Sequence, residues 1–425
     1  MSSRQEVIVE KAKWEEVKLN EVCDLISRGI TPSYIQEDGV VVINQKCIRD
    51  NRVNLDLSRL TNPIKRKIPE QKYLKSYDVL INSTGVGTLG RVAQIKEIKE
   101  KITVDSHVTI VRGNEKILPR YLGYNLFMQQ ANIENLGEGS TGQTELSRTR
   151  LGEAISIKLP PINEQKAIAN VLNSLDEKIE TNNQINKTLE EIAAAIFKHW
   201  FVDFEFPNEN GEPYRSSGGE MVESELGMIP KFFELKTLEE IALINPTEKL
   251  SKGKESIYVE MANLPTHSAR IKGYDKKEYK GGTKFRNGDI LFARITPCLE
   301  NGKTAIVDFL KDGEIGFGST EYIILRPLVL NSYYLYLLSR NDEFRNNAIK
   351  NMNGTSGRQR VDSSAIKQYR VACPTDEILE RFLKICKPMF EQIKYNDEVS
   401  NALSNTRDTL LPKLMSGEIR VPIEE

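Results

Sequence analysis

Leu159-Pro160-Pro161-Ile162-Asn163-Glu164-Gln165 opens the stretch that decides the fold, and this stretch continues to Trp200. The prolines precede a helix start, where Asn163 can cap the first turn and Glu164 can meet the positive end of the helix dipole. Apolar side chains then recur every three or four residues, with one asparagine among them, at Ile168, Leu172, Leu175, Ile179, Asn182, Ile185, Leu189, Ile192 and Ile196. Sustained over about five turns or more, this spacing makes a narrow apolar seam that another helix must cover.

A second stretch of the same kind follows Pro374, with Thr375 at the cap and acidic residues in the first turn. Its seam consists of Ile378, Phe382, Ile385, Met389, Gln392, Asn396, Val399, Leu403, Thr406 and Leu410. Two such helices in one chain are expected to cover each other, and the polar seam residues Asn182, Gln392 and Asn396 would fix their register. The alternative is a pair of helices inside a larger globular core. Pro388 lacks a backbone donor and should kink or interrupt the second helix.

The chain also repeats itself with a period near 215 residues. Trp14-Glu15 matches Phe233-Glu234, Tyr77-Asp78-Val79-Leu80 matches Gly288-Asp289-Ile290-Leu291, and Gly139-Ser140-Thr141-Gly142 matches Gly354-Thr355-Ser356-Gly357. The order is the same in both copies and the offset changes only between 211 and 219 residues. This ordered set indicates an internal duplication.

Each copy begins with a part of mixed character and ends in one of the long helices. Short β-rich runs at residues 40–43, 78–81, 289–293 and 322–325 are separated by Gly, Asn and Pro. The predicted class is therefore α+β, with two compact bodies and two long helices. The predicted segments are a first body at 1–160, a helix at 161–200, a connector at 201–230, a second body at 231–374, a helix at 375–415 and a tail at 416–425.

Charge is distributed unevenly, although the 425-residue chain has a net charge of only −1. Residues 1–160 hold 24 basic and 20 acidic residues, and residues 221–374 hold 23 and 19, whereas 161–220 hold 5 and 11. Two mildly basic bodies are therefore joined by acidic segments, so a polyanion is expected to bind at two places.

Several classes of protein are excluded by composition. No apolar run reaches the roughly 18 residues of a membrane span, and the start of the chain has no apolar signal core, so a cytoplasmic location is expected. The 5 cysteines are scattered without a C-x-x-C pair and should be reduced, buried thiols. With 3 histidines in the chain, a histidine-rich metal site is not expected.

Two motifs look catalytic without the context that catalysis needs. Gly85-Val86-Gly87-Thr88-Leu89-Gly90 fits G-x-G-x-x-G, but residues 91–95 alternate like a strand, so a hairpin turn is predicted. Gly302-Lys303-Thr304 resembles the end of a P-loop, but Pro297 stands where its first glycine should be. Neither a methyltransferase motif nor a nuclease set of carboxylates and lysine is found, so no active site and no cofactor of its own are predicted.

The remaining polar motifs indicate nucleic-acid binding. Arg358-Gln359-Arg360 follows the second Gly/Ser/Thr loop, and Arg and Gln are the side chains that read guanine and adenine edges. Gln143 and Thr144 occupy the corresponding place in the first copy, followed by Arg148. Candidate phosphate contacts are Lys65, Arg66, Lys67, Arg91, Lys284, Arg294 and Lys303. The alternative for any one of these residues is ordinary solvated charge.

These residues resemble a known family. The duplication, the helix start at 159–165, the helix end Phe197-Lys198-His199-Trp200-Phe201-Val202-Asp203-Phe204 and the terminal Leu410-Leu411-Pro412-Lys413-Leu414-Met415-Ser416-Gly417 are similar to type I restriction enzyme specificity subunits. The resemblance covers essentially the whole chain. It implies that each body is a target-recognition domain for double-stranded DNA and that the helices form an antiparallel coiled-coil spacer between the two domains.

The resemblance also implies partners. It predicts a non-catalytic subunit that recruits two methyltransferase subunits, which use S-adenosylmethionine, and restriction subunits, which translocate DNA with ATP and Mg. Aromatic and apolar residues at the helix ends are expected to dock against partner subunits or the opposite helix end; they are Trp200, Phe201, Phe204, Phe206, Leu414, Met415 and Ile419. The alternatives are a self-contained DNA methyltransferase or nuclease, and a scaffold that does not contact DNA.

The spacer predicts a target of two short specific segments with a gap of fixed length. Residues 163–198 would span about 50 Å at 1.5 Å per residue. Four residues inserted after Asn183 should therefore lengthen the gap by about one or two base pairs and leave both half-sites unchanged.

Overall fold

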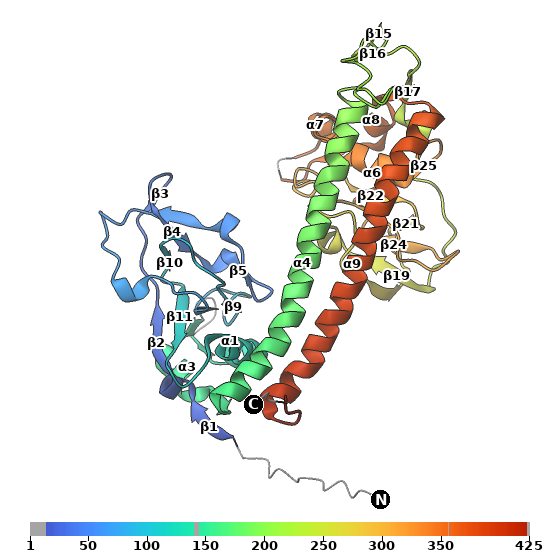
Figure 1. Ribbon diagram of the computed structural model, residues 1–425. Coiled ribbons are helices and arrows are strands. Elements are labelled where there is room, and N and C mark those ends of the chain that lie inside the picture. The colour runs from blue at the N-terminus through green and yellow to red at the C-terminus, as the bar shows by residue number, and fades with distance from the viewer. Residues whose placement is uncertain (1–13, 140–143, 356, 423–425) are drawn as a thin grey trace, which may run out of the picture. The chain divides into compact units, whose positions relative to one another are not determined.

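The computed structural model describes residues 14–139, 144–355 and 357–422 (Figure 1). Its contacts divide the chain into two compact units. Unit 1 comprises the described parts of Met1–Ile179 and Ala402–Glu425. Unit 2 comprises Glu180–Asn401 except residue 356, which lies outside the described ranges. Each unit therefore takes part of both long helices, whereas the segments predicted from the sequence treated each helix as one piece.

Two long helices, α4 (Ile162–Phe201) and α9 (Asp376–Ser416), lie side by side in Figure 1. In unit 1, Glu164 bonds Arg420 just beyond the end of α9, and Asp176 bonds Arg407. In unit 2, Asn186 bonds Asp397 and the Phe201 ring packs on Phe382. Rising numbers on α4 meet falling numbers on α9 within each unit, so the helices pair antiparallel. The predicted α+β class with paired long helices is confirmed.

Polar residues line the α4–α9 interface in unit 2. Asn182 Nδ2 donates to Ser400 Oγ at 3.1 Å, and Asn396 Nδ2 donates to Asn186 Oδ1 at 2.8 Å. Gln392 Nε2 donates to Asn396 Oδ1 at 2.8 Å. The three seam residues named from the sequence thus belong to one hydrogen-bonded set. The bonds of Asn182 and Asn396 cross between the helices and hold in only one axial register, whereas the Gln392 bond lies within α9.

The predicted seam is wrong at Ile185, Ile192 and Ile385, which are 39%, 40% and 37% exposed. Asn186, Ala193 and Phe197 are buried in their place. The reason is that a helix turns once per 3.6 residues, so a strict three-four count drifts around its surface over several turns. The packing partners, and not the most apolar residues, decide which face is buried.

The helix boundaries differ slightly from the sequence prediction. α4 begins at Ile162, with the Pro161 carbonyl accepting from the N–H groups of Glu164 and Gln165, so Asn163 lies in the first turn and is not the cap. α9 begins at Asp376, directly after Thr375. α9 also runs through Pro388 without interruption, since Cys386 and Phe390 on either side are buried and hold both flanking turns in place.

The globular part of unit 1 is built on a pair of four-stranded sheets, β2-β11-β8-β9 and β10-β4-β7-β3. Its strands are β1 (Glu15–Lys18), β2 (Cys23–Arg28), β3 (Tyr34–Ile35), β4 (Val40–Ile43), β5 (Ile48–Arg49), β6 (Arg52–Val53), β7 (Arg59–Thr61), β8 (Val79–Asn82), β9 (Val92–Gln94), β10 (Ile102–Val104), β11 (Val108–Gly113), β12 (Gly137–Glu138), β13 (Glu145–Leu146) and β14 (Ser156–Leu159). Helices α1 (Pro119–Met128), α2 (Gln130–Glu134) and α3 (Arg148–Ala154) complete it.

Unit 2 repeats this plan with the sheets β18-β25-β22-β23 and β20-β19-β24-β21. Its strands are β15 (Met221–Ser224), β16 (Gly227–Pro230), β17 (Glu234–Thr237), β18 (Ala242–Ile244), β19 (Glu255–Val259), β20 (Asp275–Glu278), β21 (Thr283–Phe285), β22 (Ile290–Ala293), β23 (Thr304–Ile306), β24 (Gly316–Gly318), β25 (Tyr322–Pro327), β26 (Met352–Asn353), β27 (Arg360–Val361) and β28 (Arg370–Cys373). Its shorter helices are α5 (Leu238–Ile241), α6 (Ser332–Arg340), α7 (Asp342–Lys350) and α8 (Ser363–Lys367).

A buried ion pair marks the same place in both units. Asp78 before β8 binds Arg112 of β11 at 2.6 Å, and Asp289 before β22 binds Arg326 of β25 at 2.6 Å. Val79 pairs with Val111 and Ile290 pairs with Leu325, so in each unit the aspartate and the arginine stand one residue beyond a pair of the same sheet. The internal duplication found in the sequence is thereby confirmed in three dimensions.

The aromatic residues at the end of α4 belong to the core of unit 2. Trp200 and Phe201 pack on Phe382 at ring-centroid distances of 5.9 and 4.9 Å, while Phe204 and Phe206 pack on Phe233 at 5.9 and 5.4 Å. Each of the four is at most 8% exposed. All four lie in the core of unit 2, and Trp200 and Phe201 meet the beginning of α9, which is the second predicted option. Docking of these residues against partner subunits stays a prediction.

The apolar residues at the end of α9 are divided in the same way. Leu414 and Met415 are 2% exposed each and belong to the core cluster of unit 1 that also contains Ile168 and Leu172 of α4, while their contact with partner subunits stays a prediction. Ile419 is 37% exposed, and its role as a partner contact stays a prediction.

A buried carboxylate fixes the tail of the chain to unit 1. Glu164 is 8% exposed and accepts from Trp14 Nε1 at 3.0 Å and from Arg420 Nη1 at 2.7 Å. We expect Arg420→Ala to lower the free energy of unfolding of unit 1 by about 1.5–3 kcal/mol, because a buried carboxylate loses a charged donor. Urea unfolding followed by Trp14 fluorescence in a Trp200→Phe background measures this, and Lys413→Ala, in an exposed pair with Glu418, is the control. Equal losses for both variants would contradict the assignment.

Candidate nucleic-acid interface

The Gly85–Gly90 loop of unit 1 is a hairpin connection. β8 and β9 pair antiparallel with Ile81 opposite Val92, so the predicted hairpin is confirmed. Gly90 has φ +81°, and a Cβ there would lie 2.7 Å from the Cα of Glu134, so only glycine fits. The loop brings Thr84 within 2.9 Å of His107 Nδ1.

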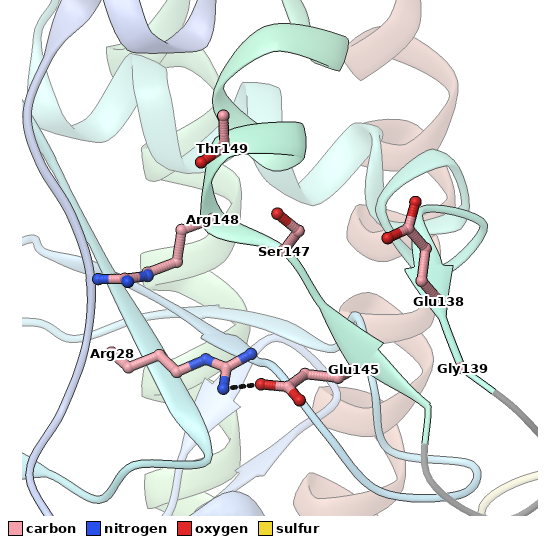
Figure 2. A pocket seen from close by; sticks show the side chains of 7 residues that line it. All are labelled: Arg28, Glu138, Gly139, Glu145, Ser147, Arg148 and Thr149. Carbon is pink, nitrogen blue, oxygen red and sulfur yellow. Dashed lines mark ion pairs between the residues drawn. The ribbon is translucent and has the colours of Figure 1, made fainter.

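A short ridge of β12, β13 and the beginning of α3 lies beside this hairpin. Glu145 of β13 forms a β-bridge with Thr84, and the Leu146 N–H donates to the Ser83 carbonyl at 2.8 Å. The ridge and the end of β2 enclose a polar pocket of about 470 Å³ (Figure 2), which is lined by Arg28, Glu138, Gly139, Glu145, Ser147, Arg148 and Thr149. Arg28 forms an ion pair with Glu145, drawn as a dashed line in Figure 2, and donates to the Leu146 carbonyl.

The charged residues of the pocket lining are Arg28, Arg148, Glu138 and Glu145, and Arg28 and Arg150 pair with the two glutamates. Arg148 is exposed, and no carboxylate among the described residues pairs with it. Burial, together with the nearby Arg148 charge, lowers the pKa of Arg28, and the same causes lower the pKa of Lys72, whose ammonium bonds Ser27 and the Arg28 carbonyl. An anion bound between these cationic side chains would reduce their mutual repulsion and stabilise their charged forms.

Unit 2 builds the same framework from different side chains. Arg360 of β27 forms a β-bridge with Ile295, and the Val361 N–H donates to the Arg294 carbonyl at 3.0 Å. Arg360 is clamped by Glu321, with Nε and Nη2 donating to Oε1 at 2.9 and 2.7 Å. The clamp raises the pKa of Arg360 and lowers the pKa of Glu321, so both stay charged at neutral pH.

The predicted DNA-binding residues of unit 1 are spread over two places. Thr144 and Arg148 lie at the ridge, whereas Gln143 lies outside the described residues. Lys65, Arg66 and Lys67 are exposed in the turn after β7, and Arg66 donates to the Thr31 carbonyl at 2.6 Å. Arg91 donates to the Gly87 carbonyl at 2.8 Å, so it also holds its own loop.

In unit 2 the predicted residues are likewise divided. β26, β27 and the beginning of α8 form the corresponding ridge of unit 2, where Arg358, Gln359 and Arg360 come together with Arg294. Lys303 Nζ donates to the Met261 carbonyl at 2.6 Å and Lys284 Nζ to the Glu248 carbonyl at 2.8 Å, so both ammonium groups hold loops of their own unit. DNA contact by these residues stays a prediction.

Sequence reasoning missed Arg28, Lys72 and Glu321 as parts of these sites. Arg28 reaches Glu145 across more than a hundred residues, and nothing in its neighbourhood marks it. Glu321 stands one residue before β25 without a motif. The sequence contained one signal for these partners. Glu145 and Arg360 are aligned in the repeat but carry opposite charges, so each requires its own ion-pair partner of opposite charge.

Within the residues that the structure describes, no helix combines the length and hydropathy of a membrane span, and no group of three or more histidines, cysteines and carboxylates could hold a metal ion. All five cysteines are free thiols, and Cys47, Cys373 and Cys386 are buried.

Comparison with known proteins connects this geometry to a family. The family model described as "Type I restriction modification DNA specificity domain" matches residues 11–191 and 230–405. The MjaIX specificity subunit of a type I restriction enzyme from Methanocaldococcus jannaschii is 29% identical over 76% of this chain and 74% of that protein. The HindI specificity subunit from Haemophilus influenzae is 23% identical over 96% of this chain and 99% of that protein.

The fold has a solved counterpart. The crystal structure of the S subunit of a type I restriction-modification system from M. genitalium matches with a TM-score of 0.56 at 15% identity, over 96% of this chain and 97% of that one. The two matched ranges of the family model cover most of the chain and fall on its two repeats. The chain therefore belongs to the type I restriction modification DNA specificity family and is a specificity subunit that carries two copies of the domain.

Proposed function

We propose that each globular part of this subunit reads one half of a split, asymmetric DNA target. The observation that carries the proposal is a shared framework with different side chains: the ridge presents Thr144, Glu145 and Arg148 in unit 1 and Arg358, Gln359 and Arg360 in unit 2. Different donors and acceptors satisfy different base edges in the major groove. Two unlike ridges therefore favour two unlike half-sites.

In the proposed function the subunit positions its partner enzymes at the DNA target and catalyses no reaction itself. Two methyltransferase subunits would supply adenine methylation with S-adenosylmethionine, and restriction subunits would supply cleavage with ATP and Mg. The family membership supports these partners. This chain would contribute DNA contacts through its two globular parts and a fixed length through α4 and α9.

Mapping of N6-methyladenine in DNA exposed to the assembled methyltransferase tests the proposal. The expected result is one motif with two specific segments and a gap of constant length. A self-contained methyltransferase would methylate DNA as the purified chain alone, and a scaffold without DNA contact would give the same motif after either globular part is exchanged. Either result would overturn the proposal.

Arg358→Ala tests the separation of the two half-sites. Arg358 is exposed at the ridge of unit 2, and its loss should relax or weaken only the second half-site, by about 1–3 kcal/mol if it pairs with a base. Arg148→Ala removes an exposed arginine from the ridge of unit 1 and should affect only the first half-site. Competition binding with duplexes altered in one half-site measures both. An even loss over all sequences would assign these arginines to phosphates.

A further inference from the structure

The two ridges carry opposite charges at one equivalent position. Backbone hydrogen bonds fix the equivalence: Ser83 N–H binds the His107 carbonyl and Arg294 N–H binds the Glu321 carbonyl, at 2.8 and 3.0 Å. Glu145 and Arg360 then form the β-bridges to the residues that follow, Thr84 and Ile295. The side chain at this position is thus an acceptor in unit 1 and a donor in unit 2.

Each of these side chains is held by a partner of opposite charge from a different strand end. Arg28, at the end of β2, binds Glu145, and Glu321, directly before β25, binds Arg360. The partners are the less exposed members, at 27% for Arg28 and 23% for Glu321, against 55% for Glu145 and 40% for Arg360. The ridge residue therefore faces solvent, and the partner stands behind it.

The hydrogen bonds leave a defined set of donors on Arg360. Nε and Nη2 donate to Glu321, and Nη1 donates to the Arg358 carbonyl at 3.2 Å. A guanidinium has five N–H groups, so one on Nη1 and one on Nη2 remain. Two donors on one guanidinium match the O6 and N7 acceptors of guanine.

Glu145 offers the opposite pattern. Arg28 binds its Oε1, which leaves Oε2 able to accept a hydrogen bond. In the major groove an acceptor of this kind matches the amino group of cytosine or adenine. Arg28 also donates to the Leu146 carbonyl at 3.0 Å, which fixes the carboxylate relative to the ridge.

We propose that positions 145 and 360 contact one base each with opposite polarity, so that Arg360 reads a guanine in one half-site and Glu145 reads an amino-bearing base in the other. Arg28 and Glu321 are positioning residues for these contacts. This inference rests on the proposed function. It adds to that function the kind of base that each domain recognises and the residues that determine this choice.

The test uses the full chain, a library of duplex DNA randomised over the target, and sequencing of the retained DNA. Arg360→Gln should change the preference at one base pair from guanine toward adenine, since Gln matches adenine N6 and N7, with a change in discrimination of about 5- to 150-fold. The first half-site should be unchanged. Arg370→Gln, with the same loss of charge in unit 2 at a similar exposure of 43%, should leave both half-sites unchanged.

Positioning is tested by Glu321→Gln and by the reversed pair Arg28→Glu with Glu145→Arg. Glu321→Gln should reduce discrimination at the base pair that Arg360→Gln changes, without weakening the binding of non-specific DNA. The reversed pair should create a guanine preference in the first half-site. Trp200 fluorescence verifies that the unit 2 variants are folded, because this side chain is 6% exposed in the core of that unit.

Two failures can be told apart. If the wild-type chain enriches no bipartite sequence, the proposed function fails and takes this inference with it. If the wild type enriches one and Arg360→Gln weakens all sequences evenly, with the salt dependence reduced by about one ion, then Arg360 contacts a phosphate and only the inference is overturned. An unchanged motif in every variant has the same consequence.

Discussion

Four residues inserted after Ile179 in α4, together with four after Asn401 in α9, are expected to lengthen the gap of the DNA target by about one or two base pairs. These positions mark the boundary between the two units in each helix. One helical turn of four residues adds about 6 Å. Since one base pair occupies about 3.4 Å, the gap changes while the sequences of both half-sites stay the same.

The structure improves the design of this insertion over the site after Asn183. Asn182 and Asn186 on either side of that site bond Ser400 and Asp397 on α9, so an insertion between them would break the polar set. The paired insertion keeps Asn182, Asn186, Asn396 and Ser400 together in unit 2. It also keeps the two helices equal in length.

Methylation mapping of the assembled enzyme measures the gap. A four-residue insertion after Gly211 is the control, because a side chain there would meet open space and the residue lies outside both long helices. The control should retain the original gap. If the paired insertion also retained it, or altered bases within a half-site, α4 and α9 would not be the spacer.

Asp78→Ala is expected to destabilise unit 1 by about 3–5 kcal/mol. The Asp78 side chain is 2% exposed and receives hydrogen bonds from Arg112 Nε at 2.8 Å and from the Lys75 N–H at 2.8 Å. Arg112 is 13% exposed and has Asp78 as its carboxylate partner. Removal of the Asp78 carboxylate leaves the largely buried Arg112 guanidinium with the Tyr73 carbonyl as an acceptor but with no opposite charge.

The equivalent Asp289→Ala in unit 2 is the matched comparison and should cost less. Arg326 keeps a second carboxylate there, because Glu248 Oε1 lies 2.7 Å from its Nη2. The two tryptophans separate the measurements, since Trp14 lies in unit 1 and Trp200 in unit 2. Urea unfolding of Trp200→Phe and Trp14→Phe backgrounds therefore reports each unit alone. Equal losses for the two aspartate variants would show that Glu248 does not compensate.

The long helices and the duplication follow from the sequence alone, for a local reason. Three-four spacing after Pro161 and Pro374 predicts helices wherever the chain is placed, and two apolar seams in one chain have each other as nearest partners. Asn182 and Asn396 could be named as register residues because polar groups within a seam must pair. The Gly85–Gly90 hairpin follows from alternation on both of its sides.

Tertiary structure alone decided which faces are buried and which charges meet. Ile185 and Ile192 are partly exposed while Asn186 is buried, because the hydrogen-bonding partners on α9 select the face. Trp200 and Phe201 lie in the core of unit 2 because Phe382, far away in sequence, covers them. Arg28 meets Glu145 only after β2, β11 and β8 have paired and the ridge has docked on the end of β8. Periodicity and turn chemistry are properties of neighbouring residues, whereas these contacts depend on strand pairings across long stretches of chain, which no local pattern encodes.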